Sequence, residues 1–341
     1  MNGVIIIDKP AGWTSHDVVN RMRRILQQRS VGHLGTLDPL ATGVLPLVTG
    51  SLTRLAQFYV ASEKTYEGVI RFGFATNTYD ADGDPVDQVS NHEGRADTGT
   101  AHVGTAAPGC PSGRRPDLTL DALQALAAEF HGPIQQTPPP FSAKKIHGTP
   151  AYKLARKQKE VVLQPVQVEV KEFTITAVEN DRAHFRARVS SGTYMRSIAH
   201  EMGQRLGCGA HLASLRRTSV AEFDITQAHT IEEIETTCHS EVWGGRPRPP
   251  IPPAATHSTE LHPRQQLDTL FIHPRQLLPH FPSVTADEPT AARIRSGRPI
   301  NLPELSRARQ VKVFASQTDL LAIATRVAGT LFHPKIVFPS E

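Results

Sequence analysis

One stretch near the N-terminus constrains this chain more than any other: residues 32–47, which read Gly-His-Leu-Gly-Thr-Leu-Asp-Pro-Leu-Ala-Thr-Gly-Val-Leu-Pro-Leu. Its single acidic residue is Asp38, and Pro39 directly after it favours an extended backbone that helps to fix the direction of the carboxylate. Glycines such as Gly35 allow sharp turns and close approach of a ligand. Most other residues of the stretch are apolar, so we expect a carboxylate that needs a positively charged partner to stay ionised.

The residues alone leave two interpretations of this stretch, a structural glycine-rich connection with a capping aspartate or a site built around Asp38. The string closely resembles the catalytic motif of the TruB family of tRNA pseudouridine synthases. The resemblance implies that Asp38 is the catalytic residue. It also implies that His33 occupies the space vacated by the target base, and that Gly35 belongs to the substrate-binding surface.

The N-terminal segment agrees with this resemblance. Residues 4–7 are apolar and predict a buried strand, and a turn with Lys9 and Pro10 follows. A helix capped by Thr14 or Ser15 is predicted to run to about residue 28. The sequence of the strand and turn looks like the N-terminal motif of the family, in which Lys9 helps to support the active site.

A second segment carries an aromatic candidate. Residues 64–74 alternate in polarity, which predicts a strand with Tyr66 at the start of one face. Burial statistics alone favour a core aromatic at this position. The Lys-Thr-Tyr sequence matches the family motif whose tyrosine stacks on the target base, so the resemblance implies instead that Tyr66 is catalytic.

A basic segment follows in the middle of the chain, at residues 136–160. Its positive side chains are interleaved with aromatic residues, a pattern that suits phosphate contacts and stacking on unpaired bases, although a solvated basic helix is the alternative. The segment resembles the part of TruB that closes over the RNA loop, and the resemblance assigns four of its residues to RNA binding: Lys144, Lys145, Tyr152 and Arg156.

The string Gly-Thr-Tyr-Met-Arg, residues 192–196, opens a further predicted helix that ends near Gly207. A guanidinium stays ionised and binds a carboxylate bidentately, so Arg196 suits the partner of a buried acid, and a surface arginine is the alternative. The string matches the family motif whose arginine pairs with the catalytic aspartate. The resemblance also assigns Tyr194 to substrate binding and Leu215 to the lining of the base pocket.

Composition limits the classes of protein that remain. A net charge of +4 over 341 residues is only mildly basic, so a site for a polyanion must come from local clustering of charge. Three widely spaced cysteines argue against a disulfide framework or a zinc knuckle, and the 16 histidines show no ligand-like spacing. No apolar run approaches membrane-spanning length and no signal peptide is recognisable, which predicts a cytoplasmic protein without a membrane partner.

The resemblance implies an α+β pseudouridine synthase fold, with a mixed, mostly antiparallel sheet and flanking helices. The C-terminal part resembles, more weakly, the small β-barrel PUA domain that follows many catalytic domains of the family. The predicted domains are a catalytic domain at 1–235, with an insertion at 90–117, a proline-rich linker at 236–281, and a PUA-like RNA-binding domain at 282–341. Further strands are expected at residues 161–170, 173–178, 183–189, 310–315, 320–327 and 330–338, and helices at 52–59, 118–130 and 286–296.

The resemblance implies isomerisation of uridine 55 in the T-loop of tRNA, after the uridine is flipped out of the folded RNA. This reaction needs no cofactor and no metal, and the sequence does not decide whether Asp38 attacks C6 of the base or C1′ of the ribose. The expected partner is the T-arm of tRNA, with the protein as a monomer. Two alternatives stay open: a tRNA-binding or folding protein without catalysis, and a synthase of the same fold acting on another RNA.

Overall fold

The computed structural model describes residues 2–86, 118–142, 144–146, 148–155, 157, 163–242, 268–304 and 306–339. Within these residues the chain forms two compact units, which we call the first unit (Met1–Ser62 with Ser219–Glu341) and the second unit (Glu63–Thr218). The boundary between them falls inside strand β12 (Ala210–Val220). The predicted insertion at 90–117 lies outside the described residues.

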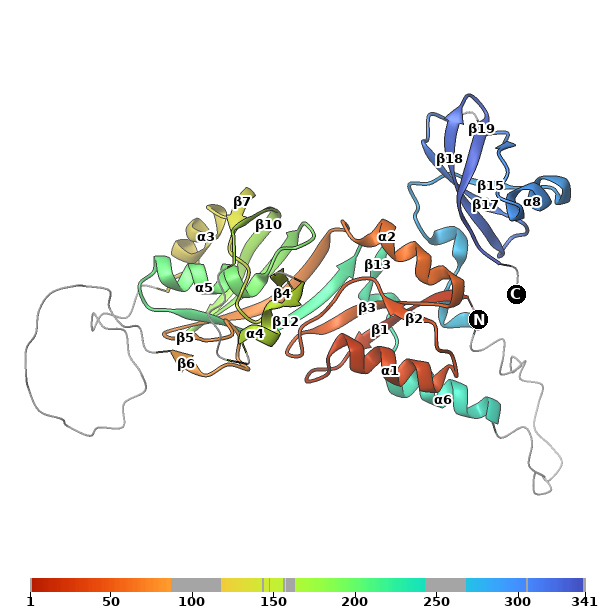
Figure 1. The fold of residues 1–341 in the computed structure, drawn as a ribbon. Coiled ribbons are helices and arrows are strands. Elements are labelled where there is room, and N and C mark those ends of the chain that lie inside the picture. The colour runs from red at the N-terminus through yellow and green to blue at the C-terminus, as the bar shows by residue number, and fades with distance from the viewer. Residues whose placement is uncertain are drawn as a thin grey trace, which may run out of the picture. The chain divides into compact units, whose positions relative to one another are not determined.

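The N-terminal part of the first unit is a small antiparallel sheet with helices beside it (Figure 1). Strand β1 (Gly3–Lys9) lies between β3 (Thr42–Thr49) and β14 (Phe271–Ile272), and β2 (Val31–His33) also pairs with β3. Helix α1 begins at the predicted cap, because the Thr14 side chain accepts from the Asp17 amide and the Asp17 side chain accepts in return. The remaining elements here are α1 (Ser15–Ile25), the 3-10 helix η1 (Gly50–Leu55), α2 (Ala56–Tyr59), β13 (Phe223–Asp224), the 3-10 helix η2 (Ile225–Gln227) and α6 (Ile231–Val242).

The C-terminal part of the first unit is a five-stranded sheet in the order β15-β17-β18-β19-β16, with α8 beside it (Figure 1). Its elements are the 3-10 helix η4 (Pro274–Gln276), β15 (Ser283–Thr285), α8 (Glu288–Arg295), β16 (Ile300–Asn301), β17 (Gln310–Phe314), β18 (Leu320–Ala328) and β19 (Leu331–Val337). Only β15 and β17 pair in parallel among these strands as described. Phe314 and Ile336 of this sheet share one buried cluster with Val4 and Tyr59, so the two ends of the chain have a common core.

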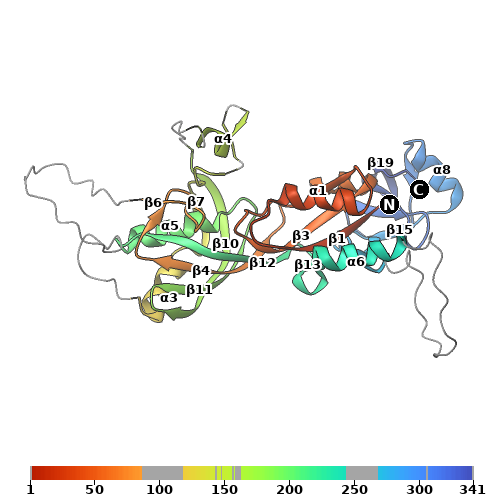
Figure 2. The same ribbon diagram turned by 90° about the horizontal axis from the view of Figure 1, so that it is seen from below.

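The second unit contains most of a larger antiparallel sheet, in the order β12-β4-β11-β10-β7. Helix α3 packs on β10, where the Gln124 side chain donates to the carbonyl of Ile175. In Figure 2 the segment that carries α4 stands away from the strands of this sheet. The elements of the unit are β4 (Lys64–Phe72), β5 (Ala75–Thr76), β6 (Pro85–Val86), α3 (Leu120–Ala128), β7 (Gly132–Gln136), β8 (Lys145–Ile146), β9 (Thr149–Pro150), α4 (Ala151–Ala155), β10 (Val166–Glu179), β11 (Arg182–Val189) and α5 (Met195–Arg205).

Most elements lie where the sequence predicts them, with ends that differ by a few residues, as in α1, which ends at Ile25 and not near residue 28. Two differences are larger. The strands expected at 161–170 and 173–178 are one strand, β10, which begins at Val166 and absorbs a shift of register between Val170 and Glu172. The predicted linker at 236–281 begins inside α6, which continues to Val242, and near its other end β14 pairs with β1. The division into domains stays a prediction.

Candidate functional site

The loop that carries Asp38 is held by the start of helix α1. The Ser15 hydroxyl donates to the carbonyl of Leu37 (3.1 Å), and the Leu37 amide donates to the Ser15 oxygen (2.8 Å). Both groups are buried, so each would lose a partner in a water-free place if the serine were removed. The residue directly before Asp38 is therefore fixed at both of its backbone polar groups.

The residue directly after Asp38 is fixed as well. The Lys9 ammonium is fully buried and donates to the carbonyls of Pro10 (2.9 Å), Trp13 (2.6 Å) and Pro39 (3.2 Å). The Gly12 amide also donates to the Pro39 carbonyl (2.9 Å). Lys9 thus supports the loop from inside the first unit.

Asp38 itself is half-buried, and the leucines Leu34 and Leu37 beside it are buried as the sequence predicts. The Asp38 carbonyl accepts from the Ala41 amide (3.1 Å), which closes a turn. Gly35 has a φ of +152°, a region that favours glycine, and its amide donates to Nδ1 of the half-buried His33 (3.3 Å). The first unit therefore brings Lys9, His33 and Gly35 to the Asp38 loop.

In the second unit, Tyr66 lies on β4, where it pairs with Ala187 of β11 and is mostly buried. Lys64 lies two residues earlier on the same face of the strand, and burial, together with the nearby Arg217 guanidinium, lowers the pKa of its ammonium to about 8. Leu215 on β12 is also buried. No local sequence pattern predicts that Lys64 and Arg217 are buried close together, because β4 and β12 meet only in the folded sheet.

Arg196 is buried in the first turn of α5. The helix begins at Met195, a few residues later than the sequence predicts. Its guanidinium lies 3.4 Å from the carboxylate of Asp80, which is equally buried, and donates to the carbonyls of Thr78 and Phe141 (3.1 Å each). Asp80 lies in the turn between β5 and β6. The site residues predicted from the sequence do not include this buried partner of Arg196.

Tyr194, the half-buried N-cap residue of α5, is held by one glutamine. The Gln136 side chain accepts from the Tyr194 amide (2.8 Å) and donates to the Tyr194 carbonyl (3.1 Å). This pair fixes the start of the helix against the end of β7. Tyr194 and Arg196 thereby share one rigid turn.

The basic segment is described only in part. Lys144 and Lys153 are exposed and Tyr152 is half-buried. The backbone is joined by bonds from the Ala151 amide to the Lys144 carbonyl (2.7 Å) and from the Tyr152 amide to the Ser142 carbonyl (3.0 Å). Arg156 lies outside the described residues, and only the backbone of Lys145 is described.

Comparison with solved structures identifies the class of fold. The chain aligns over 99% of its length with an H/ACA RNP bound to a substrate RNA containing 2′-deoxyuridine, at a TM-score of 0.64 and 21% identity over 85% of that chain. It aligns with an archaeal box H/ACA sRNP Nop10-Cbf5 complex at a TM-score of 0.63 and 22% identity, covering 99% of this chain and 86% of that chain. The fold is that of the pseudouridine synthases with a PUA-like C-terminal sheet, which confirms the predicted fold class.

Comparison of sequences then gives the family. The model described as "TruB family pseudouridylate synthase (N terminal domain)" matches residues 23–107 and 109–195, and the model of the tRNA pseudouridylate synthase B C-terminal domain matches residues 196–243. A tRNA pseudouridine synthase B from Solibacter usitatus is 44% identical over 99% of this chain and all of its own length. One from Stutzerimonas stutzeri is 34% identical over 100% of this chain and 97% of its own length. The chain belongs to the TruB family, and its activity is that of a pseudouridine synthase, an isomerase.

No described helix is long and apolar enough to cross a membrane.

Proposed function

We propose that this enzyme converts uridine 55 in the T-loop of tRNA to pseudouridine, with Asp38 as the catalytic carboxylate. The observation that carries the proposal is the Asp38 loop, in which Ser15 holds the residue before the aspartate and Lys9 holds the residue after it. Such a loop presents one carboxylate in a fixed direction among buried leucines, as a reaction that depends on positioning requires. The names of the curated relatives support tRNA as the substrate.

The reaction is an isomerisation that balances without any co-reactant. The bond between N1 of uracil and C1′ of the ribose breaks, the base rotates, and a bond forms between C5 and C1′. The hydrogen on C5 leaves as a proton, and N1 gains a proton. In the proposed mechanism the Asp38 carboxylate attacks either C6 or C1′, and the site excludes water so that the detached base is retained.

The remaining site residues have proposed roles around this step. Tyr66 stacks on the uracil and removes the C5 proton. Arg196 holds the aspartate ionised and oriented. His33 fills the space that the flipped base leaves, Leu215 lines the base pocket, and Tyr194 and Gly35 contact the substrate.

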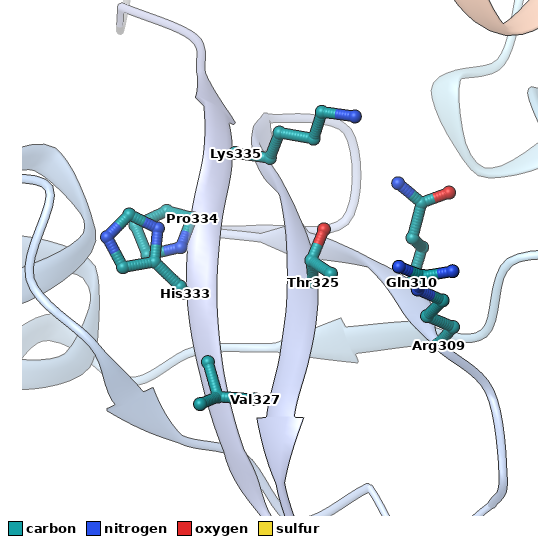
Figure 3. A pocket seen from close by; sticks show the side chains of 7 residues that line it. All are labelled: Arg309, Gln310, Thr325, Val327, His333, Pro334 and Lys335. Atoms are coloured by element: carbon teal, nitrogen blue, oxygen red, sulfur yellow. The ribbon is translucent and has the colours of Figure 1, made fainter.

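RNA binding is proposed for two basic surfaces. The first is the segment that carries Lys144, Lys145, Tyr152 and Arg156. The second is a hollow of about 690 Å³ on the C-terminal sheet, shown in Figure 3. It is lined by Arg309, Gln310, Thr325, Val327, His333, Pro334 and Lys335, which include basic and no acidic side chains. Lysine and arginine at these places would bind phosphates irrespective of sequence.

The test is to incubate the full chain with an unmodified tRNA transcript, without metal or cofactor, and to map pseudouridine along the product. We expect pseudouridine at position 55 alone, and none in a transcript with cytidine at that position. Pseudouridine at another position, or only in an RNA other than tRNA, would favour the alternative of a same-fold synthase with a different substrate. The cytoplasmic location and the monomeric state stay predictions.

A further inference from the structure

Two aromatic rings that have no part in the proposed reaction stack beside Arg196. The rings of Tyr79 and His200 lie parallel, with centroids 3.7 Å apart and an angle of 10° between their planes. Tyr79 belongs to the turn between β5 and β6, and His200 belongs to α5. Both side chains are half-buried, so the pair is a packed contact between two elements.

The position of the stack ties it to the Arg196 ion pair. Tyr79 lies between Thr78, whose carbonyl accepts from Arg196, and Asp80, whose carboxylate pairs with it. His200 follows Arg196 by four residues on α5, so the two side chains project from the same face of the helix. The ring stack and the ion pair therefore both connect the Thr78–Asp80 turn to the same face of α5.

The backbone of Tyr79 needs support. Its φ is +66°, in the left-handed region that a bulky residue rarely adopts. The turn around it is fastened by the Thr76 hydroxyl, which donates to the Asp80 carbonyl (2.7 Å), and by the Leu212 amide, which donates to the Tyr79 carbonyl (3.0 Å). This backbone conformation sets where the carbonyl of Thr78 and the carboxylate of Asp80 face, so a contact that holds Tyr79 also holds both acceptors of Arg196.

His200 is suited to packing rather than to proton transfer. Its Nδ1 atom is buried and has no hydrogen-bond partner among the described residues. Burial also lowers the pKa of the imidazole, so the ring stays neutral at neutral pH, although the neighbouring Glu201 acts in the opposite direction. A phenyl ring at this position would keep the stacking face and would lose no side-chain hydrogen bond to the described residues.

We propose that Tyr79 and His200 are positioning residues, which hold the Thr78–Asp80 turn against α5 so that Asp80 fixes the Arg196 guanidinium in its working orientation. The inference rests on the role proposed above for Arg196. In the proposed mechanism neither ring touches the reacting atoms. Their effect on the reaction passes through Arg196 alone.

The test compares variants that remove a ring with variants that keep it. His200→Ala removes one ring, and Tyr79→Asn removes the other while tolerating the left-handed backbone. His200→Phe and Tyr79→Phe keep both stacking faces. The measurements are the single-turnover rate on tRNA, the dissociation constant for tRNA, and the midpoint of thermal unfolding, with the exposed His131→Ala as a matched control.

We expect each ring-removing variant to react about tenfold more slowly while binding tRNA within about twofold of wild type, because misplacement of a catalytic group affects the chemical step. Each ring-keeping variant should recover to within about threefold, and His131→Ala should be unchanged. The double variant of Tyr79→Asn with His200→Ala should be within about twofold of the slower single variant, because both remove the same contact.

Wild-type rates in His200→Ala and Tyr79→Asn would overturn the inference, as would a loss of tRNA binding or of folded protein that accounts for the whole loss of rate. Failure of His200→Phe and Tyr79→Phe to recover the rate would also overturn it. Arg196→Met in the same series separates this inference from the proposed function. If Arg196→Met is fully active, the proposed role of Arg196 is wrong; if it is inactive while both ring-removing variants are fully active, only the positioning inference is wrong.

Discussion

At the scale of single residues, Arg196 is bound in a way that only a guanidinium satisfies. It contacts the Asp80 carboxylate and donates to the carbonyls of Thr78 and Phe141, which come from two separate segments. A planar group with several fixed donors reaches acceptors on two sides at once, whereas an ammonium is a compact point charge. These three acceptors therefore help to set the orientation of the guanidinium.

Substitution of Arg196 should separate charge from geometry. We predict that Arg196→Lys lowers the single-turnover rate by about tenfold or more. The positive charge remains, but the planar arrangement of N–H donors that reaches all three acceptors is lost. Arg196→Met should be slower still, because it also leaves the buried Asp80 carboxylate without this partner. The rates of both variants on tRNA check this, and a lysine variant with the wild-type rate would contradict it.

The sequence predicted Arg196 as the partner of Asp38, which stays a prediction, and it did not predict the ion pair of Arg196 with Asp80. Arg196 directly follows Thr-Tyr-Met at the start of a predicted helix, so a local sequence pattern is enough to indicate it. Asp80 lies in an Asp-Ala-Asp-Gly-Asp run whose composition is typical of any exposed turn. Its burial depends on the tertiary approach of α5, which no local pattern contains.

Lys64 gives a prediction about pH and stability. Its pKa is about 8 in the folded protein, because of burial and of Arg217, and about 10.4 in the unfolded chain. Between these pH values the unfolded state binds more protons, so this residue makes the free energy of unfolding rise with pH. Below pH 8 the buried charge costs stability, on the order of 3 kcal/mol.

Lys64→Met removes this charge. We predict that the variant is more stable than wild type at pH 7, and that the difference shrinks as the pH approaches 10. Urea unfolding of both proteins at the two pH values measures the difference. A difference that does not change with pH would mean that the Lys64 ammonium is fully compensated in the folded protein.

At the scale of elements, the start of α1 clamps the Asp38 loop. Ser15→Ala removes the hydroxyl that donates to the Leu37 carbonyl and leaves the buried Leu37 amide without its acceptor. We predict a loss of about 1–3 kcal/mol in the free energy of unfolding. The single-turnover rate should also fall, because the loop next to Asp38 is released.

The matched control is Ser283→Ala, at an exposed serine of β15. It should leave both the stability and the rate near wild type. If Ser15→Ala behaved like this control, the contact between α1 and the loop would not position Asp38.

Elements with a strong local signal were predicted well, and boundaries set by tertiary contacts were not. Helix α1 begins at its capping threonine, and α8 ends before Gly297, whose φ is +71°. Strand β10 instead continues through the place where the sequence suggested a break, because its pairing with β11 accommodates the shift of register. Helix α6 continues past the predicted start of the linker to Val242.

At the scale of the whole molecule, the two basic surfaces make separate predictions about RNA binding. Replacing Lys144 and Lys153 by glutamine should weaken tRNA binding and reduce the slope of log K against log salt by up to about two units. Replacing Arg309 and Lys335 by glutamine should do the same if the C-terminal hollow contacts phosphates.

The control replaces the exposed Arg182 and Arg186 of β11 by glutamine, and it should leave the slope within about half a unit of wild type. A slope that is unchanged in one test pair would remove that surface from the proposed RNA contacts. A fall in the control as large as in the test pairs would mean that the charge of the whole molecule, and no particular surface, sets the affinity.

The most direct test of the central claim is the reaction of Asp38→Asn with tRNA that carries tritium at C5 of its uridines. Formation of the C5–C1′ bond releases this hydrogen to water, so tritium release counts turnovers. We predict release by wild type and none above background by Asp38→Asn, with tRNA affinity within about tenfold of wild type, or about 1.4 kcal/mol, because the amide nearly matches the carboxylate in shape and lacks its nucleophilic oxygen. Measurable tritium release by the Asp38→Asn protein would show that Asp38 is not the catalytic carboxylate.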